Sequence, residues 1–426
     1  MELARTLDEA ISALALDPIE PGSPWYVAPT ISVASGKKLP PLARLRAQLL
    51  RSEETDRFFL SGHIGSGKTT ELRRLLADPE IRRRFYVVAF DVAPTDRPSL
   101  SSHELLFLVA AELYRRASTD DALTCFEKKD RWLGILKRMD AALYGPTGLH
   151  VQGGKFGVVF DLFFLKLSQD ISVDDVRRKE FRRFAETQGS ALVDLIDALV
   201  ADLASALVYA GLPHRVLVAI DDLEKLQRQD QFHEIFETNL GALLAPRVPL
   251  LVTVPPSITF GAPGTGLGQR VTHLRPIQVL TKTAAADPAA AVDAAGIATL
   301  RSILAARLVP GLFTPQVVAE AALYSGGVIR EFVRLLRLSA IQALDLYGQK
   351  KVTNVAFEDV LVEERNGLAR TLYPTDKEAL RAIHETHALK DPTELDYMRR
   401  SVVFEYNHEG IWWEAAPMLW EWLSKA

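Results

Sequence analysis

The chain has 426 residues, of which 48% are hydrophobic and 24% charged, and its formal net charge is −4. The length suggests two to three domains, and the composition is ordinary for a globular protein. The single cysteine, Cys125, excludes a disulfide framework within the chain and a cysteine-based zinc site. Proteins that coat nucleic acid are usually basic, so any contact with nucleic acid is expected to be local.

The sequence also predicts where the protein works. Met1 is not followed by the apolar core of a signal peptide. The most apolar long stretch, 191–212, carries Asp194, Asp197 and Asp202 at roughly one-turn intervals, which is typical of an amphipathic helix. We therefore expect no membrane association and a cytoplasmic location.

The first 40 residues are expected to form a short helix and then a rigid, turn-rich segment. Apolar residues recur at helical spacing up to Leu14, and prolines and a glycine follow between Pro21 and Pro29. Tyr26 and Val27 either pack on the adenine ring of a nucleotide or cover the edge of the core. A second helix is predicted at 42–50.

Residues 62–69 read G-x-x-x-x-G-K-T, the phosphate-binding Walker A motif. A predicted strand at 57–61 precedes it and a leucine-spaced helix follows, which is the context that this motif requires. Lys68 would reach the β- and γ-phosphates, and the Thr69 hydroxyl would bind Mg²⁺. The residues expected to contact ATP are Gly62, His63, Ile64, Gly65, Ser66, Gly67, Lys68, Thr69 and Thr70.

Beyond the next predicted strand (86–91) and helix (101–116), the strand–helix alternation breaks down. We interpret residues 118–190 as an insertion into the core, with a hairpin candidate at 148–164 and a charged helix at 174–183. Four arginines of this helix form either a solvated face or a patch that binds DNA phosphates. They are Arg177, Arg178, Arg182 and Arg183.

The second chemical motif follows an apolar run that predicts a buried strand at 215–221. The run ends in Asp221-Asp222-Leu223-Glu224, which is typical of a Walker B strand. Asp221 is the predicted metal ligand together with Thr69. Asp222 is the first candidate for the acid that orients the attacking water, and Glu224 is the second.

Three further residues are predicted near the phosphates. Thr253, near the end of a predicted strand (250–254), is the first candidate for a polar residue near the phosphates, and Ser257 is the second. Thr253 can also be a β-branched core residue. Arg270 precedes a short strand and is placed to reach the nucleotide of a neighbouring subunit. Arg330 begins a helix after Gly326-Gly327 and could fold back onto the phosphates from a lid. Either arginine can equally be a solvated surface residue.

The remainder of the chain predicts two helical modules. A linker at 284–295 precedes lid helices at 297–308, 315–324 and 331–344. The last module predicts a helix at 375–386, a hairpin around a four-residue turn at 407–410, and a closing helix, which is typical of a winged helix.

Charge and tryptophans set this last module apart. Residues 371–426 contain ten acidic and six basic residues, so the whole acidic excess lies there. They also hold four of the six tryptophans. The charge argues against DNA binding through this module and favours contact with a protein.

These elements together resemble AAA+/STAND-type ATPases. The likeness rests on 62–69, on Ile220 to Glu224, on Gly326 to Arg330 and on the terminal winged helix, and it is greatest for the initiator, origin-recognition and transposition-regulator branch and for bacterial conflict-system relatives. It implies an α/β fold: a P-loop NTPase core with a parallel sheet, a helical lid and a C-terminal winged-helix-like domain. The implied segments are an N-terminal helix with an adenine-side segment, the core, the lid and the winged helix, at 1–40, 41–280, 281–370 and 371–426.

The resemblance also implies ATP and Mg²⁺ as cofactors and a homo-oligomer whose site is completed by a neighbour's arginine. Many AAA+ proteins have Asp-Glu where this chain has Asp221-Asp222, which favours a slow, regulatory ATPase. The first functional hypothesis is a switch ATPase that controls an effector protein, for example in antiviral (antiphage) defence. The alternative is a DNA-associated ATPase that acts as a loader, initiator or transposition regulator.

Overall fold

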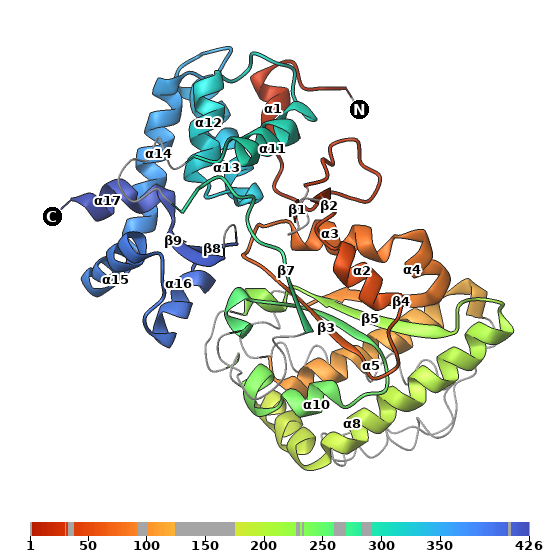
Figure 1. The fold of residues 1–426 in the computed structure, drawn as a ribbon. Coiled ribbons are helices and arrows are strands. Elements are labelled where there is room, and N and C mark those ends of the chain that lie inside the picture. Colours follow the sequence, from red (N-terminus) through yellow and green to blue (C-terminus); the bar gives the residue numbers. More distant parts are fainter. Residues whose placement is uncertain are drawn as a thin grey trace.

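The computed structural model describes residues 2–29, 31–32, 38–92, 100–123, 175–226, 231, 234–259, 270–282, 292–407 and 410–425. Figure 1 shows an α/β body that contains the main sheet and a second, mostly helical body beside it. Among the described residues, none of the helices combines the length and the apolar character needed to cross a membrane.

The main sheet has five strands in the order β4-β5-β6-β3-β7, and every neighbouring pair is parallel. The strands are β3 (Arg57–Ser61), β4 (Phe85–Asp91), β5 (Arg215–Asp221), β6 (Leu250–Val254) and β7 (Val271–His273). Since the strands run in one direction, all their carboxyl ends meet at one edge of the sheet, where ligands of such sheets bind.

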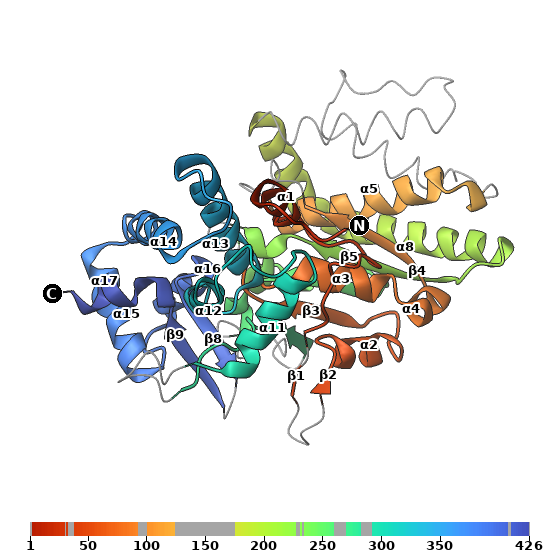
Figure 2. The same cartoon turned by 90° about the horizontal axis from the view of Figure 1, so that it is seen from above.

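Helices cover both faces of this sheet (Figures 1 and 2), as the continuous apolar runs predict. Phe58 and Leu60 of β3 point to one face, which is covered by α2 (Ala43–Leu49), α3 (Lys68–Leu76) and α4 (Pro79–Arg84). Phe59 points to the other face. That face is covered by α5 (Ser102–Thr119), α8 (Asp175–Tyr209) and α10 (Leu240–Leu244).

Helix α8 shows that the predicted insertion is shorter than the sequence suggests. The sequence predicts separate helices at 174–183 and 191–212, but α8 is one helix of 35 residues that packs along α5. The ends of the predicted insertion are therefore parts of two core helices. The hairpin predicted at 148–164 lies outside the described residues.

The second body contains the lid helices α11 (Ala294–Ala305), α12 (Pro315–Tyr324), α13 (Ile329–Ile341) and α14 (Asn354–Ala369). The N-terminal helix α1 (Leu7–Ala13) belongs to this body, where it packs on α13 (Figures 1 and 2). A capping box between Thr6 and Glu9 starts α1. A small antiparallel pair, β1 (Ile31–Ser32) and β2 (Lys38–Leu39), follows α1 in the chain.

The C-terminal part has the predicted helix, hairpin and closing helix, and a second, short helix that the sequence did not predict lies before the hairpin. These elements are α15 (Pro374–Thr386), α16 (Leu395–Arg399), β8 (Val403–Asn407), β9 (Ile411–Ala415) and α17 (Trp420–Ser424). Trp412 is fully buried and stacks on Tyr406 with ring centroids 4.8 Å apart. This tryptophan is thus core material, and its hydrophobic cluster is continuous with that of the lid.

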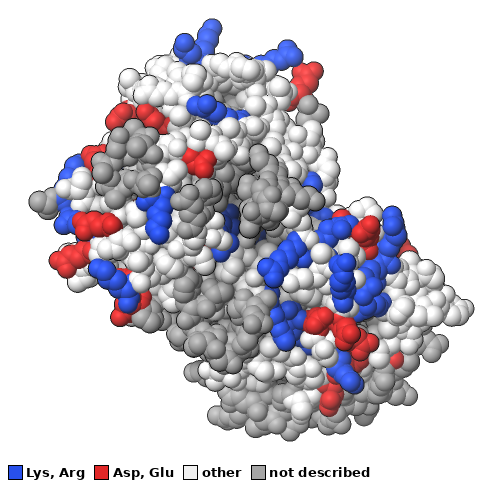
Figure 3. Space-filling view, in the orientation of Figure 1, with Lys and Arg blue, Asp and Glu red and all other residues white. Residues whose placement is uncertain are grey.

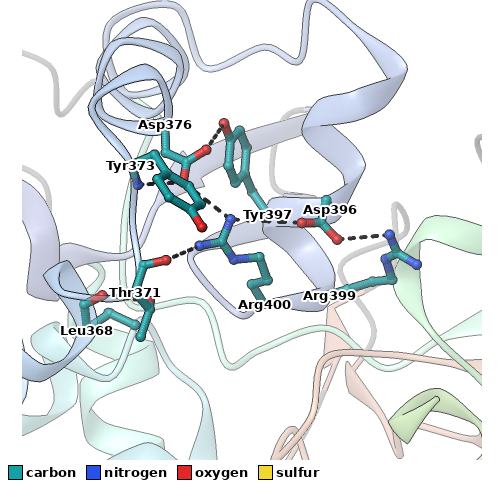
Figure 4. A network of polar contacts seen from close by, with 8 residues as sticks. All are labelled: Leu368, Thr371, Tyr373, Asp376, Asp396, Tyr397, Arg399 and Arg400. Atoms are coloured by element: carbon teal, nitrogen blue, oxygen red, sulfur yellow. Dashed lines mark hydrogen bonds and ion pairs between the residues drawn. The ribbon is translucent and has the colours of Figure 1, made fainter. Parts of the chain in front are cut away.

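A polar network holds the first two of these helices together (Figure 4). The Arg400 guanidinium donates to the carbonyl of Thr371 at 2.6 Å and lies 3.4 Å from Asp376. Asp376 also accepts hydrogen bonds from the Tyr397 hydroxyl and from the backbone N–H of Tyr373. Arg400 therefore ties the end of α16 to the start of α15 and to the segment after α14.

Candidate functional site: the phosphate-binding loop

The Walker A residues form a loop between β3 and α3, at the carboxyl edge of the sheet. Gly65 and Gly67 have φ angles of 85° and 98°, which only glycine adopts without strain. Gly62 has no room for a side chain either, because a Cβ there would lie 2.4 Å from the Leu274 carbonyl oxygen. The glycines of the motif are thus required by backbone conformation and by close packing.

Lys68 is buried inside this loop. Its ammonium group donates to the carbonyls of Gly62 and His63 at 2.8 and 2.9 Å. It also lies 3.2 Å from Oε1 of Glu224, so a buried ion pair joins the loop to the end of β5. This cation is therefore held at the mouth of the loop, where a phosphate group would meet it.

Asp221 ends β5 and lies beyond β6 from the loop, because β6 separates β5 from β3. Its carboxyl pKa is raised by burial and by the nearby Glu224 carboxylate. The nearby hydroxyls of Thr69 and Thr253 oppose this rise. The structure thus brings Thr69 and Thr253 close to Asp221, and their shared role at a metal and phosphate site stays a prediction.

The two candidates for the water-orienting acid differ in position. Glu224 lines the pocket of the loop and pairs with Lys68. Asp222 has a left-handed backbone (φ 72°) and forms an ion pair with Lys225, and it is absent from the pocket lining. The geometry therefore favours Glu224, the second candidate of the sequence, over Asp222.

The pocket is closed by residues from both bodies of the molecule. Arg330 lines it, and the backbone N–H of Arg330 donates to the Gly65 carbonyl at 3.1 Å. The lid is thus in direct contact with the loop, and the predicted contact of Arg330 with the phosphates stays a prediction. The segment 15–19, which follows α1, also lines the pocket. It is fixed by a hydrogen bond from Ile19 N to the Thr70 hydroxyl.

The adenine-side residues predicted from the sequence are not in this pocket. The Tyr26 hydroxyl donates to Glu71 at 2.7 Å, and its ring lies under the Arg74 guanidinium at 3.4 Å. Val27 packs against the hydrophobic cluster of the lid. These contacts favour the other alternative for Tyr26 and Val27, that they cover the edge of the core, since residues 15–19 line the pocket instead.

Arg270 lies on the far side of the core. It precedes β7, whose residues pair with the middle and end of β3, so Arg270 is level with the amino end of β3. It is exposed and lines a separate hollow with Arg44, Arg51 and Arg57. It therefore cannot act on the nucleotide of its own chain, and its predicted role in a neighbour's site stays a prediction.

Some predicted residues lie apart from the pocket or cannot be placed. The side chains of Arg177, Arg178, Arg182 and Arg183 are outside the described part of the chain, although their backbone belongs to α8. Ser257 is buried after β6 without a hydrogen-bond partner among the described residues, and it does not line the pocket.

Sequence reasoning missed the pocket residues that come from distant parts of the chain. These are the segment 15–19, Lys225, Arg307 and Val333. No local pattern marks the segment 15–19 and Val333, because their position depends on the packing of α1 and α13 and not on spacing within an element.

The donor set fits a magnesium nucleotide. Oxygen atoms of Asp221, Asp222 and Glu224 all lie within 4.8 Å of one another. Carboxylate and hydroxyl oxygens are the protein ligands that Mg²⁺ prefers, and it shares them with substrate phosphates. Thr69 and Asp221 are the residues that would hold such an ion, and the loop would hold the phosphates.

Comparisons with known proteins give structural likeness only. No protein-family model matches the chain, and no curated protein matches it. The chain is similar in fold to the Orc1 protein of Aeropyrum pernix, solved in complex with DNA, at 16% identity over 90% of this chain and 91% of that one, with a TM-score of 0.37. It is also similar to Cdc6p of Pyrobaculum aerophilum, at 14% identity over 85% and 84%, with a TM-score of 0.35.

A third likeness is to a Walker-type ATPase of Pyrococcus abyssi, at 13% identity over 95% of this chain and 100% of that one, with a TM-score of 0.42. At these low values none of the three likenesses supports a function for this chain. The parallel sheet, the loop and the acidic cluster by themselves define a P-loop NTPase core, followed by a helical lid and a winged-helix-like module. The predicted fold class is therefore confirmed, whereas the predicted domain boundaries stay predictions.

Proposed function

We propose that the protein binds ATP with Mg²⁺ at the loop of residues 62–69 and hydrolyses it. The observation that carries this proposal is the meeting of Lys68, Thr69, Asp221 and Glu224 at one sheet edge. Burying a lysine and a carboxylate costs free energy, because both charges leave water, and their mutual attraction offsets this cost only where the geometry is good. Phosphate oxygens would replace Glu224 as the partner of Lys68.

Each residue then has a separate task. Loop N–H groups and Lys68 hold the phosphates, and Thr69 and Asp221 hold the metal ion, which neutralises phosphate charge. Glu224, once released from Lys68, is placed to orient the attacking water. The Arg330 side chain reaches the same pocket from the lid, so nucleotide binding and lid position are linked.

Nucleotide binding and phosphate release test this proposal. Lys68→Ala should abolish ATP binding in calorimetry and phosphate release in a turnover assay, since the loop loses its cation. Lys390→Ala is the control, because this exposed lysine lies in the C-terminal module. Wild-type protein that binds no ATP in the presence of Mg²⁺ contradicts the proposal.

For the role of the ATPase, one observation favours DNA association over control of an effector protein. Arg44, Arg51 and Arg270 are exposed around a hollow with Arg57 at its wall. The pKa of Arg57 is lowered to about 10 by burial and by the charge of Arg270. Figure 3 shows several lysine and arginine side chains over the core, with acidic side chains between them.

We therefore propose that this hollow contacts the phosphates of a DNA backbone. Neither Arg44 nor Arg270 has an ion-pair partner among the described residues, so their charges are available. Arg44 belongs to α2, and Arg51 follows shortly after the end of this helix. Both arginines line the same hollow. Such contacts are independent of sequence and depend strongly on salt.

Fluorescence anisotropy with a labelled duplex at low and moderate salt separates the two roles. The triple variant Arg44→Ala, Arg51→Ala, Arg270→Ala should weaken binding, and a second variant that replaces the four arginines of α8 tests the patch predicted from the sequence. A control removes three exposed arginines of the helical body, Arg5, Arg301 and Arg370.

The absence of DNA binding with and without ATP would rule out the DNA-associated role. It would leave the switch ATPase with an effector partner, including one in defence. Measurement of the mass in solution with and without ATP tests the predicted homo-oligomer in either case.

A further inference from the structure

Arg307 is a buried cation that lines the proposed nucleotide pocket. It lies between α11 and α12 and is 5% exposed. Its backbone is fixed, because its carbonyl accepts a hydrogen bond from Ala4 N at 3.0 Å. The pKa of its guanidinium is lowered by burial, and within the described part of the chain no ion pair offsets this effect.

The donors of this guanidinium are mostly unused by the described part of the chain. Nη1 lies 3.5 Å from the Ala13 carbonyl oxygen, and Nε is buried without a partner. Arginine has five N–H donors and no acceptor. The C-terminal end of α1 offers a partial negative charge, which compensates only part of the cost of burial. The remaining donors require acceptors, and the pocket is the place where a ligand can supply them.

The contacts along α13 show which end of the pocket Arg307 occupies. At Arg330 the helix touches the loop through Gly65, and at Arg337 it touches α1 through the Ile11 carbonyl. Val333 lies between them and lines the pocket, about 4.5 Å along the axis from Arg330. Arg307 contacts Ala13 of α1, and so it lies toward the end that is remote from the phosphates.

The pocket also has an apolar wall, to which Leu16, Pro18 and Val333 contribute. An apolar wall together with a phosphate loop suits a nucleotide, whose base is flat and apolar on its faces and polar only at its edge.

We propose that Arg307 is the residue that recognises the base of the bound nucleotide, by donating hydrogen bonds to acceptor nitrogens or oxygens at the edge of a purine. This inference rests on the proposed nucleotide site and adds to it the source of base recognition. The base supplies the acceptors that Arg307 lacks within the chain, and the apolar wall packs on its faces.

The test compares the binding of ATP with that of tripolyphosphate, which has the phosphates but neither the ribose nor the base. Wild-type protein should bind both, and Lys68→Ala should bind neither. Arg307→Met, which keeps most of the length and removes the donors, should weaken ATP binding roughly ten- to a hundredfold, the effect of losing one or two hydrogen bonds to a charged group. Its affinity for tripolyphosphate should stay within about twofold of wild type. Arg307→Lys, which keeps the charge, should fall between the two.

Arg337→Met is the matched control. Arg337 also bonds a carbonyl of α1, at 3.1 Å, but it does not line the pocket. It should destabilise the contact between α1 and α13 and leave the ratio of ATP to tripolyphosphate affinity unchanged. If Arg307→Met unfolds in a thermal scan, the same ratio is measured on Arg307→Lys and Arg307→Gln.

Three results would overturn the proposal. Equal losses for ATP and tripolyphosphate would place Arg307 at the phosphates. Unchanged affinity for both would leave it a purely structural residue. An equal change of the ratio in Arg337→Met would mean that the lid acts as a whole. Failure of the nucleotide site itself would look different, since wild-type protein would then bind neither ligand.

Discussion

Nε2 of His63, a residue of the phosphate loop, accepts a hydrogen bond of 3.3 Å from the backbone N–H of Glu405 on β8. The His63 ring also packs edge-on against Phe404, with centroids 5.3 Å apart. Arg275, which follows β7, pairs with the Glu405 side chain at 2.7 Å. The loop that would hold phosphate is therefore in contact with the C-terminal hairpin.

This contact predicts a pH dependence of stability. The pKa of His63 is lowered to about 3, mainly by burial and next by the charge of Lys68, so the folded protein keeps this histidine neutral. Between about pH 6.5 and 3 the unfolded state binds the extra proton, and stability therefore falls as the pH is lowered through this window. His63→Gln lacks this proton, so wild type should lose about 2 kcal/mol more than the variant between pH 7 and pH 4.5.

Urea unfolding at the two pH values measures this difference. His214→Gln is the control, because His214 is exposed just before β5. Parallel loss of stability in wild type and His63→Gln would show that His63 is not held neutral.

The choice between the two acids after β5 predicts opposite outcomes for two similar variants. Glu224→Gln should keep ATP binding and lower single-turnover hydrolysis by about a hundredfold or more, because it removes the acid that lines the pocket. Asp222→Asn should change hydrolysis much less, since Asp222 is paired with Lys225 outside the pocket lining. Normal hydrolysis in Glu224→Gln with loss in Asp222→Asn would restore the first choice of the sequence.

The sequence predicts regular elements well but not the geometry of the acids after β5. The first and last residues of β3 and of α12 follow from local sequence pattern, and the structure confirms both. The order Asp221, Asp222, Glu224 predicts an acidic cluster, but the left-handed turn at Asp222, which aims Glu224 at Lys68, is a backbone detail with no sequence signal. The pattern also hides α14, because Val355 and Val362 on its exposed side blur the helical period.

Long-range packing accounts for the other failures. The segment 15–19 reaches the pocket because α1 packs on the lid and not on the core, and Arg307 reaches it from the lid itself. Tyr26 precedes the loop as an adenine-contacting residue would, yet Glu71 and Arg74 hold it elsewhere. The residues that complete this site lie far apart in the chain and become neighbours only in the fold.

Alanine variants at two glycines can separate the effect of backbone strain from that of a steric clash with the lid. Gly65→Ala would introduce a Cβ 2.7 Å from Cβ of Arg330, in addition to the strain of φ 85°. It should destabilise the protein by more than about 1–2 kcal/mol and weaken ATP binding at least tenfold, because the lid and the loop must move apart. Gly311→Ala has a similar φ of 100° but nothing within 4 Å, so it should show the strain without the loss of binding. Thermal unfolding and calorimetry measure both, and equal binding losses would contradict this explanation.

The C-terminal module contains a buried carboxylate between two histidines. Glu414 is fully buried, with Oε1 2.5 Å from Nδ1 of His384 and Oε2 3.0 Å from Nδ1 of His387. Its hydrogen bond raises the pKa of His384, with burial opposing and the charge of Glu385 adding to the rise.

A histidine with a raised pKa stabilises the fold below its unfolded pKa of about 6.5, and this contribution is lost as the pH rises through the folded pKa. Glu414→Gln should therefore destabilise the protein by roughly 3 kcal/mol at pH 6, since it removes one partner of a buried pair, and by less at pH 9. Glu421→Gln is the control, because Glu421 is a half-exposed carboxylate of the same module that pairs with Arg365 and Lys425. Thermal unfolding at the two pH values decides the matter, and a deficit that is larger at pH 9 than at pH 6 would show that His384 is not charged in the folded protein.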